Sequence, residues 1–210
     1  MNLSITFNKP EAITGHDWQI SQEINVSNEA GEVIAKAEIE LLTLNKHRDA
    51  LATYKLLADE ETDWEIPLNI YFKKQNLTEE LCKELHVAAS TKAQTHILIE
   101  AISVLPEYRK QGVGRYLLQE IAKKHSKIQS ISVLSLAMNA FVDADNCETE
   151  ANQQYYQQLA LENETLGRTD LSCYFVNNGF IAITVYVTHR HYPSSSPQLK
   201  LPHHLYRPTS

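Results

Sequence analysis

The segment "EYRKQGVGRYLL", residues 107–118, places cations and two glycines directly before an apolar stretch. The first turn of a helix exposes unpaired backbone N–H groups and the positive end of the helix dipole, so it binds anions. Glycine lets an anion approach the backbone closely, and arginine pairs with phosphate oxygens through its fork of N–H groups. The segment therefore predicts an anion site built from Arg109, Lys110, Gln111, Gly112, Val113, Gly114 and Arg115.

Two common phosphate-binding motifs do not fit this segment. A P-loop requires Gly-Lys-Ser/Thr, whereas Gly114 is followed by Arg115 and Tyr116. The dinucleotide fingerprint requires a third glycine, and Leu117 occupies that position. The pattern that does match is V-x-P-x-Y-R-x-x-G-x-G, which begins at Val104. A merely tight turn between a strand and a helix is the alternative explanation.

The elements around the segment predict a β-α-β unit. Residues 95–105 are apolar and β-branched, as expected of a central strand, and 130–138 read as a second buried strand. Further on, we expect a helix over 148–162, a short helix that ends at Asn178-Gly179, and a last strand. The helix between the two central strands should bury one stripe of side chains, formed by Val113, Leu117, Leu118 and Ile121.

The amino-terminal part reads as a β-meander over residues 1–45, in which 33–41 alternate to give one buried face. The expected fold class is α/β, with a mixed, mostly antiparallel sheet flanked by helices. We predict one domain over 1–192, comprising the meander, a helical insertion at 46–92 and a core at 93–192. The proline-rich residues 193–210 should form an extended or loosely docked tail.

The composition limits the classes of partner. A net charge of −7 argues against nucleic acid as the main partner, because phosphate backbones require an extended basic face. The three cysteines have neither disulfide-framework nor zinc-site spacing, and no apolar run is long enough to span a bilayer. The first residues show no secretory pattern. We therefore expect a cytoplasmic protein with no metal and no membrane partner.

The string "ISVLPEYRKQGVGRYLL" closely resembles the acetyl-coenzyme A binding motif of the GNAT superfamily of N-acetyltransferases, and "YFVNNGFIAI" resembles a later motif of that family. The resemblance covers about residues 95–187, with a gap. It implies a GNAT-like fold and acetyl-CoA as co-substrate, with the pyrophosphate on the turn described above. It also implies that the strand ahead of the turn pairs with the pantetheine arm. The cofactor residues so implied include Ile102, Ser103, Val104 and Asn139.

The resemblance implies direct attack of a neutral amine on the thioester, assisted by a base, an acid and a polarising backbone N–H near Val104. Glu100 is the acid within the central strand and the candidate base, and by period two it shares a face with Ile102 and Val104. A structural role explains Glu100 equally well. His96, assigned to the same face, is a weaker candidate. Phe175 occupies the position of the tyrosine that the family often uses to protonate the departing thiolate. The neighbouring Tyr174 is therefore the candidate proton donor, and the alternative is that Tyr174 is a packing residue.

Three functions stay open at this point. The first is an N-acetyltransferase acting on a primary amine of a small molecule or a peptide. The second is a catalytically impaired acyl-CoA-binding module, which Phe175 favours. The third is a nucleotide-binding protein, which the missing P-loop lysine disfavours. Acidic residues at 59–65 would attract a cationic amine, although a solvated loop explains them as well. A homodimer is a further expectation from the resemblance.

Overall fold

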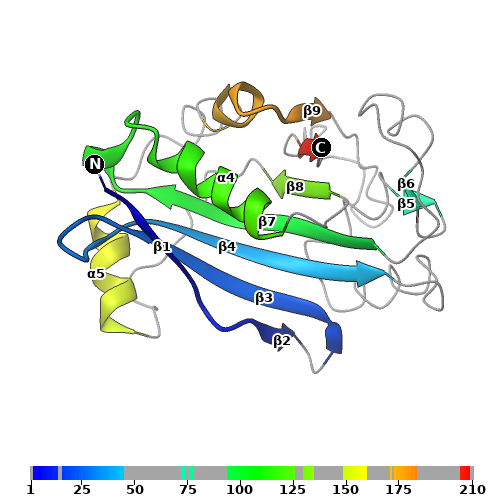
Figure 1. Cartoon of the computed structure of the whole chain (residues 1–210), viewed down its shortest axis with the longest axis horizontal. Coiled ribbons are helices and arrows are strands. Elements are labelled where there is room, and N and C mark those ends of the chain that lie inside the picture. The colour runs from blue at the N-terminus through cyan, green and yellow to red at the C-terminus, as the bar shows by residue number, and fades with distance from the viewer. Residues whose placement is uncertain are drawn as a thin grey trace, which may run out of the picture.

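The computed structural model describes residues 2–13, 16–44, 72–73, 76–77, 94–125, 130–134, 149–159, 171, 173–183 and 204–208. Its main element is an eight-stranded sheet, seen face-on in Figure 1. The strands run in the order β1-β3-β4-β7-β8-β10-β9, and β2 pairs with β3 at one edge. Only β7 and β8 pair in parallel among these strands. The predicted mixed, mostly antiparallel sheet is therefore confirmed.

The amino-terminal meander contains the two longest strands of the sheet, β3 and β4. The strands here are β1 (Ser4–Phe7), β2 (Glu11–Ile13), β3 (His16–Ser27) and β4 (Val33–Leu44). The turn between β3 and β4 uses Gly31 at φ 82°, a backbone conformation that favours glycine. Asn28 accepts hydrogen bonds from the N–H groups of Ala30 and Glu32, which fixes that turn.

The centre of the fold is the predicted β-α-β unit. It contains β7 (Gln94–Val104), a single 3₁₀ turn (Pro106–Tyr108), α4 (Val113–Lys124) and β8 (Ser130–Leu134). The predicted stripe of α4 is confirmed, because its buried residues are Val113, Leu117, Leu118 and Ile121. These side chains pack on the sheet face formed by Ala35, Ala37 and Ile39 of β4 and by the isoleucines of β7.

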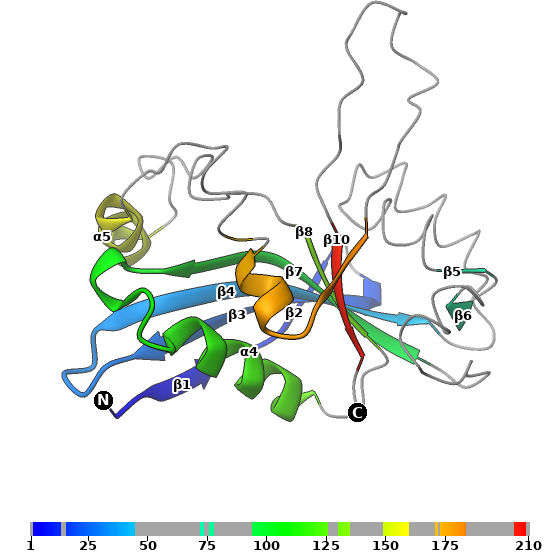
Figure 2. The same ribbon diagram turned by 90° about the horizontal axis from the view of Figure 1, so that it is seen from above.

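The opposite face of the sheet is polar and yet largely buried. By strand register Gln19, Lys36, Glu40 and His96 lie on it, and each is less than a tenth exposed. The helix α5 (Glu150–Gln158) lies on this side, and Figure 2 shows it across the sheet from α4. The meander therefore has two buried faces over much of its length, where the alternation predicts one.

The remaining described elements complete the sheet edge and a small hairpin. They are β9 (Ile181–Ile183), β10 (His204–Pro208), β5 (Phe72–Lys73) and β6 (Asn76–Leu77). The pair β5–β6 forms a separate two-stranded sheet within the predicted helical insertion. Within the predicted tail, β10 is extended and pairs with both β8 and β9. Pairing on both sides satisfies its backbone groups inside the sheet.

Candidate active site

The turn that leads into α4 has the backbone geometry that the glycine pattern predicts. Lys110 has φ 60° and Gly112 has φ 87°, so two left-handed residues are separated by a single residue. Left-handed backbone costs a side-chain-bearing residue about 1 kcal/mol, so Lys110 is held there by its surroundings. No side chain of the described residues caps Gly112, and the first intrahelical bond runs from Tyr116 N–H to the Gly112 carbonyl. The N–H groups of the first turn are thus directed at the end of α4, where they attract an anion.

Gly114 lies inside the first turn of α4, and its lack of a side chain serves Tyr174. A Cβ atom at residue 114 would lie 2.9 Å from the hydroxyl oxygen of Tyr174. The sequence pattern assigns both glycines to approach by an anion. In the structure Gly112 is required by its φ angle, whereas Gly114 makes room for an aromatic ring.

Among the described residues, the second half of β7 has no partner from β8, and this stretch is called the opening below. The parallel register of β7 and β8 runs from His96–Ser130 to Ile99–Val133, and within the described residues it extends no further. On the other side β7 stays paired with β4 up to Val104. The backbone groups of residues 100–104 that point away from β4 therefore have no hydrogen-bond partner on β8.

The hydrogen-bond alternation tells which amides face this opening. The N–H of Leu105 donates to the Ile34 carbonyl at 2.9 Å, so the backbone amide of Leu105 points toward β4. Because alternate residues of an antiparallel strand turn their amides to opposite sides, Ser103 also faces β4. Ile102 and Val104 turn away from it. The Val104 carbonyl confirms this direction, since it accepts a hydrogen bond from Arg109 Nε at 3.0 Å.

The remaining residues of the predicted cofactor set lie along the same loop. Arg109 is half-buried and connects the loop to the end of β7 through the bond to Val104. Lys110, Gln111 and Arg115 are exposed, and the Gln111 amide donates to the Glu107 carbonyl. The structure thus brings residues 102–104 and 109–115 together at one end of the opening. Asn139 lies outside the described residues.

Glu100 occupies a β-bulge, and this corrects its predicted placement. In the β4–β7 register Glu38 pairs with Ala101 and Ile39 pairs with Ile99, so Glu100 is the extra residue. The bulge interrupts period two. Ile102 and Val104 consequently share a face with Ile99, and the expectation that they share one with Glu100 by alternation is wrong. The bulge places Glu100, which is half-buried, where the opening begins.

His96 lies on the polar face of the sheet and is fully buried. Burial lowers the pKa of its imidazole to about 3, so the ring is neutral at ordinary pH. By register His96 pairs with Leu42, before the opening begins. It is thus placed away from the residues that border the opening.

Tyr174 and Phe175 lie in the short helix before Gly179, which has φ 87°. The predicted end of this helix is confirmed, because the Phe180 N–H bonds back to the Phe175 carbonyl. Phe175 is fully buried against Phe180. The Tyr174 hydroxyl is buried and has no hydrogen-bond partner within the described chain. Burial also raises the pKa of Tyr174 well above its ordinary value.

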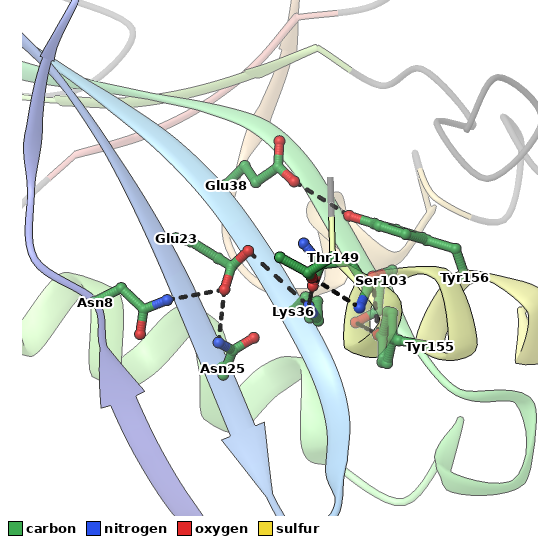
Figure 3. A network of polar contacts seen from close by, with 10 residues as sticks. Asn8, Glu23, Asn25, Lys36, Glu38, Ser103, Thr149, Tyr155 and Tyr156 are labelled. Atoms are coloured by element: carbon green, nitrogen blue, oxygen red, sulfur yellow. Dashed lines mark hydrogen bonds and ion pairs between the residues drawn. The ribbon is translucent and has the colours of Figure 1, made fainter. Parts of the chain in front are cut away.

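A polar network on the opposite face joins α5 to the strands beside the opening, as Figure 3 shows. The Tyr155 hydroxyl lies 2.9 Å from Ser103 Oγ and donates to the Ser103 carbonyl at 3.3 Å. The Tyr156 hydroxyl donates to Glu38 Oε1 at 3.1 Å. Lys36 Nζ lies 5.1 Å and 5.8 Å from the two tyrosine ring centroids.

The network was not predicted from the sequence, since "QQYYQQ" carries no functional pattern. Lys36 donates to Asn152 Oδ1, and its Nζ lies 3.9 Å from Glu23 Oε2. The Lys36 side chain is 7% exposed, so the carboxylate and the ring faces replace the water around its ammonium. The network thereby fixes α5 over β4 and the carboxyl end of β7. Within the described residues, no three potential metal ligands cluster.

Comparison with known proteins identifies the domain that carries this site. Residues 77–159 match the family profile of an acetyltransferase (GNAT) domain, a range that includes β7, the turn before α4, α4, β8 and α5. Over this range the chain is therefore similar to a GNAT acetyltransferase domain. The predicted resemblance and the predicted fold class are thereby confirmed, and the matched domain is one of acyltransferases. GNAT enzymes use acetyl-CoA as co-substrate.

Solved GNAT structures resemble the chain at low identity. An acetyltransferase of Staphylococcus aureus Mu50 is 13% identical with a TM-score of 0.38, covering 90% of this chain and 69% of its own. A Drosophila melanogaster polyamine N-acetyltransferase is 14% identical with a TM-score of 0.41, covering 89% and 74%. A mosquito arylalkylamine N-acetyltransferase-like protein is 13% identical with a TM-score of 0.41, also covering 89% and 74%. These low values carry no information about the acceptor of this chain.

No curated protein matches the chain in sequence. In the part of the chain that the structure describes, none of the helices is both long and apolar enough to cross a bilayer.

Proposed function

We propose that this GNAT protein transfers the acetyl group of acetyl-CoA to a primary amine of a small molecule or a peptide. The observation that carries the proposal is the adjacency of two features. The left-handed turn at the amino end of α4 suits a pyrophosphate, and the opening beside residues 102–104 begins directly before it. In acetyl-CoA a pyrophosphate is joined to an extended arm that carries amides. The pyrophosphate suits the turn, and the arm suits the unpaired strand backbone beside it.

Individual residues then have separate tasks. The backbone of residues 110–115 and the charges of Arg109, Lys110 and Arg115 would hold the pyrophosphate. The amides of Ile102 and Val104 would pair with the arm, because they face the opening. Ser103 would support the strand from the other side through Tyr155. Asn139 keeps its predicted part in cofactor binding.

The chemistry assigned to this chain is orientation and proton acceptance. Acetyl-CoA supplies an activated thioester, and the amine nitrogen replaces its sulfur at the acetyl carbon. The backbone N–H of Ile102 or Val104 would polarise the thioester carbonyl. Glu100 at the bulge would accept the amine proton, and the departing thiolate would take a proton from Tyr174 or from water. Orientation of both reactants supplies much of the rate increase.

The test is transfer to a panel of amines with acetyl-CoA, followed by mass spectrometry of the amine and by thiol release. The panel contains spermidine, agmatine, tryptamine and a lysine-bearing tripeptide. Amine-dependent thiol release with acetylated product is expected, and Glu100→Gln should lower kcat about 100-fold without weakening acetyl-CoA binding. Coenzyme binding without transfer to any amine would instead establish the alternative, an acyl-CoA-binding module in which Phe175 replaces the acid.

A further inference from the structure

The inference concerns Glu38, the carboxylate of β4 that faces α5 next to the bulge. It rests on the proposed function, because it concerns which amines this enzyme prefers. Glu38 pairs in register with Ala101, the residue after Glu100. By strand register it lies on the polar sheet face, opposite the face that packs on α4, and it is half-buried.

Glu38 forms no ion pair with a cation of the described residues. The ammonium of Lys36 lies 3.9 Å from Glu23. Its hydrogen-bond partner is the Tyr156 hydroxyl, a neutral donor at 3.1 Å. Burial raises the pKa of Tyr156 and the nearby charge of Glu38 raises it further, so the phenol keeps its proton and donates. A partly desolvated carboxylate held by a neutral donor attracts a cation.

The position of Glu38 separates it from the reacting atoms. The opening lies on the β8 side of β7, whereas Glu38 is on β4, the next strand on the other side. Neighbouring strands are about 4.8 Å apart, so Glu38 is one strand further from the opening than Glu100. A second charge on the acceptor, several bonds from its reacting nitrogen, would span this separation.

We propose that Glu38 is a specificity-determining residue that binds a second cationic group of the acceptor, with Tyr156 as the positioning residue that orients its carboxylate. The preferred acceptors are then amines with a positive charge at each end. The bond between Glu38 and Tyr156 is one of several that attach α5 to the sheet. α5 is also attached through Tyr155 to Ser103 and through Asn152 to Lys36.

The experiment compares two amines of similar length that differ in the second charge, agmatine and n-pentylamine. Wild type, Glu38→Gln, Tyr156→Phe and the control Glu120→Gln are compared by steady-state kinetics and by acetyl-CoA titration. Glu120 is a half-buried carboxylate on α4, on the other side of the sheet. Wild type should prefer agmatine, and Glu38→Gln should lower kcat/KM for agmatine about tenfold or more, through KM. Pentylamine turnover and acetyl-CoA affinity should stay unchanged.

Tyr156→Phe should cause a smaller rise in the KM for agmatine, with pentylamine again unaffected, because the ring and its packing remain. Equal losses for both amines, or an unchanged agmatine preference in Glu38→Gln, would overturn the inference and leave the proposed function standing. Wild-type transfer to pentylamine but not to agmatine would do the same. Transfer to neither these amines nor the wider panel would contradict the proposed function and the inference together.

Discussion

The hydroxyl oxygen of Tyr174 lies 2.9 Å from the position that a Cβ atom of residue 114 would occupy. This contact joins the short helix before Gly179 to the first turn of α4, where the anion site begins. The two motifs through which the chain resembles the GNAT family therefore lie next to each other. The contact makes the second glycine a packing requirement of the first turn of α4.

The contact predicts a non-additive pair of substitutions. Gly114→Ala should lower the free energy of unfolding by about 1–3 kcal/mol, because the added methyl group collides with the Tyr174 ring. In a Tyr174→Phe background the cost should be smaller, since the closest atom, at 2.9 Å, is the hydroxyl oxygen. A double-mutant cycle in urea measures the difference. Equal costs of Gly114→Ala in both backgrounds would mean that the ring does not limit residue 114.

Tyr174→Phe by itself tests the assignment of this residue as proton donor. A buried hydroxyl without a partner costs about 1–3 kcal/mol, so its removal should leave the stability equal or raise it. Because the hydroxyl is buried against Gly114, we expect kcat to change less than about threefold, a threshold far below the loss expected of a general acid. A loss of about 100-fold, with acetyl-CoA binding intact, would support the predicted acid role.

His96 should make the fold sensitive to acid. Burial lowers its pKa to about 3 in the folded chain from an ordinary value of 6.5, so between these values the unfolded chain binds a proton that the folded chain does not. Stability must therefore fall as pH drops through this window, by up to about 1.4 kcal/mol per pH unit.

The measurement is the free energy of unfolding against pH for wild type and His96→Gln. The variant should show a shallower decline below pH 6.5, the ordinary pKa of the histidine side chain. His125→Gln is the matched control. His125 is only half-buried, and burial together with the charge of Lys124 lowers its pKa. Parallel curves for wild type and His96→Gln would show that His96 does not cause the acid sensitivity.

Tyr155 should stabilise α5 through its bond to Ser103. Tyr155→Phe keeps the ring beneath Lys36 and removes only the hydroxyl, so a cost of about 1 kcal/mol is expected. Ser103→Ala removes the same contact from the other side, and the double variant should cost less than the sum. Denaturant unfolding of the four proteins gives the coupling. An additive double variant would show that the hydroxyls do not interact.

Local patterns predicted much of the fold. The buried stripe of α4 follows from helical spacing, and its four residues are those the periodicity names. The end of the helix at Gly179 follows from one left-handed residue. The turn at residues 109–112 was likewise predictable, because glycine and cations before an apolar stretch have a local physical meaning.

The parts that sequence reasoning missed depend on distant contacts. The bulge at Glu100 adds a residue without changing the apolar pattern, so period two assigned the wrong face. The contact between Gly114 and Tyr174 joins two separate motifs. The buried polar face, with Lys36 held by Glu23 and two tyrosine rings, carries side chains that ordinarily lie on surfaces.

The measurement that tests the central claim most directly is calorimetric titration with acetyl-CoA, coenzyme A and ATP. It compares wild type with Gly112→Asp and the matched control Gly31→Asp. The two glycines have φ 87° and 82°, and in neither case would a Cβ meet an atom within 4 Å, so both substitutions carry the same backbone strain. Only Gly112→Asp places a negative charge at the anion site.

Wild type and Gly31→Asp should bind acetyl-CoA and coenzyme A in preference to ATP, and Gly112→Asp should lose at least about tenfold in affinity. Failure of the wild type to bind acetyl-CoA, or equal binding by Gly112→Asp and Gly31→Asp, would contradict the assignment of the α4 turn as the coenzyme site.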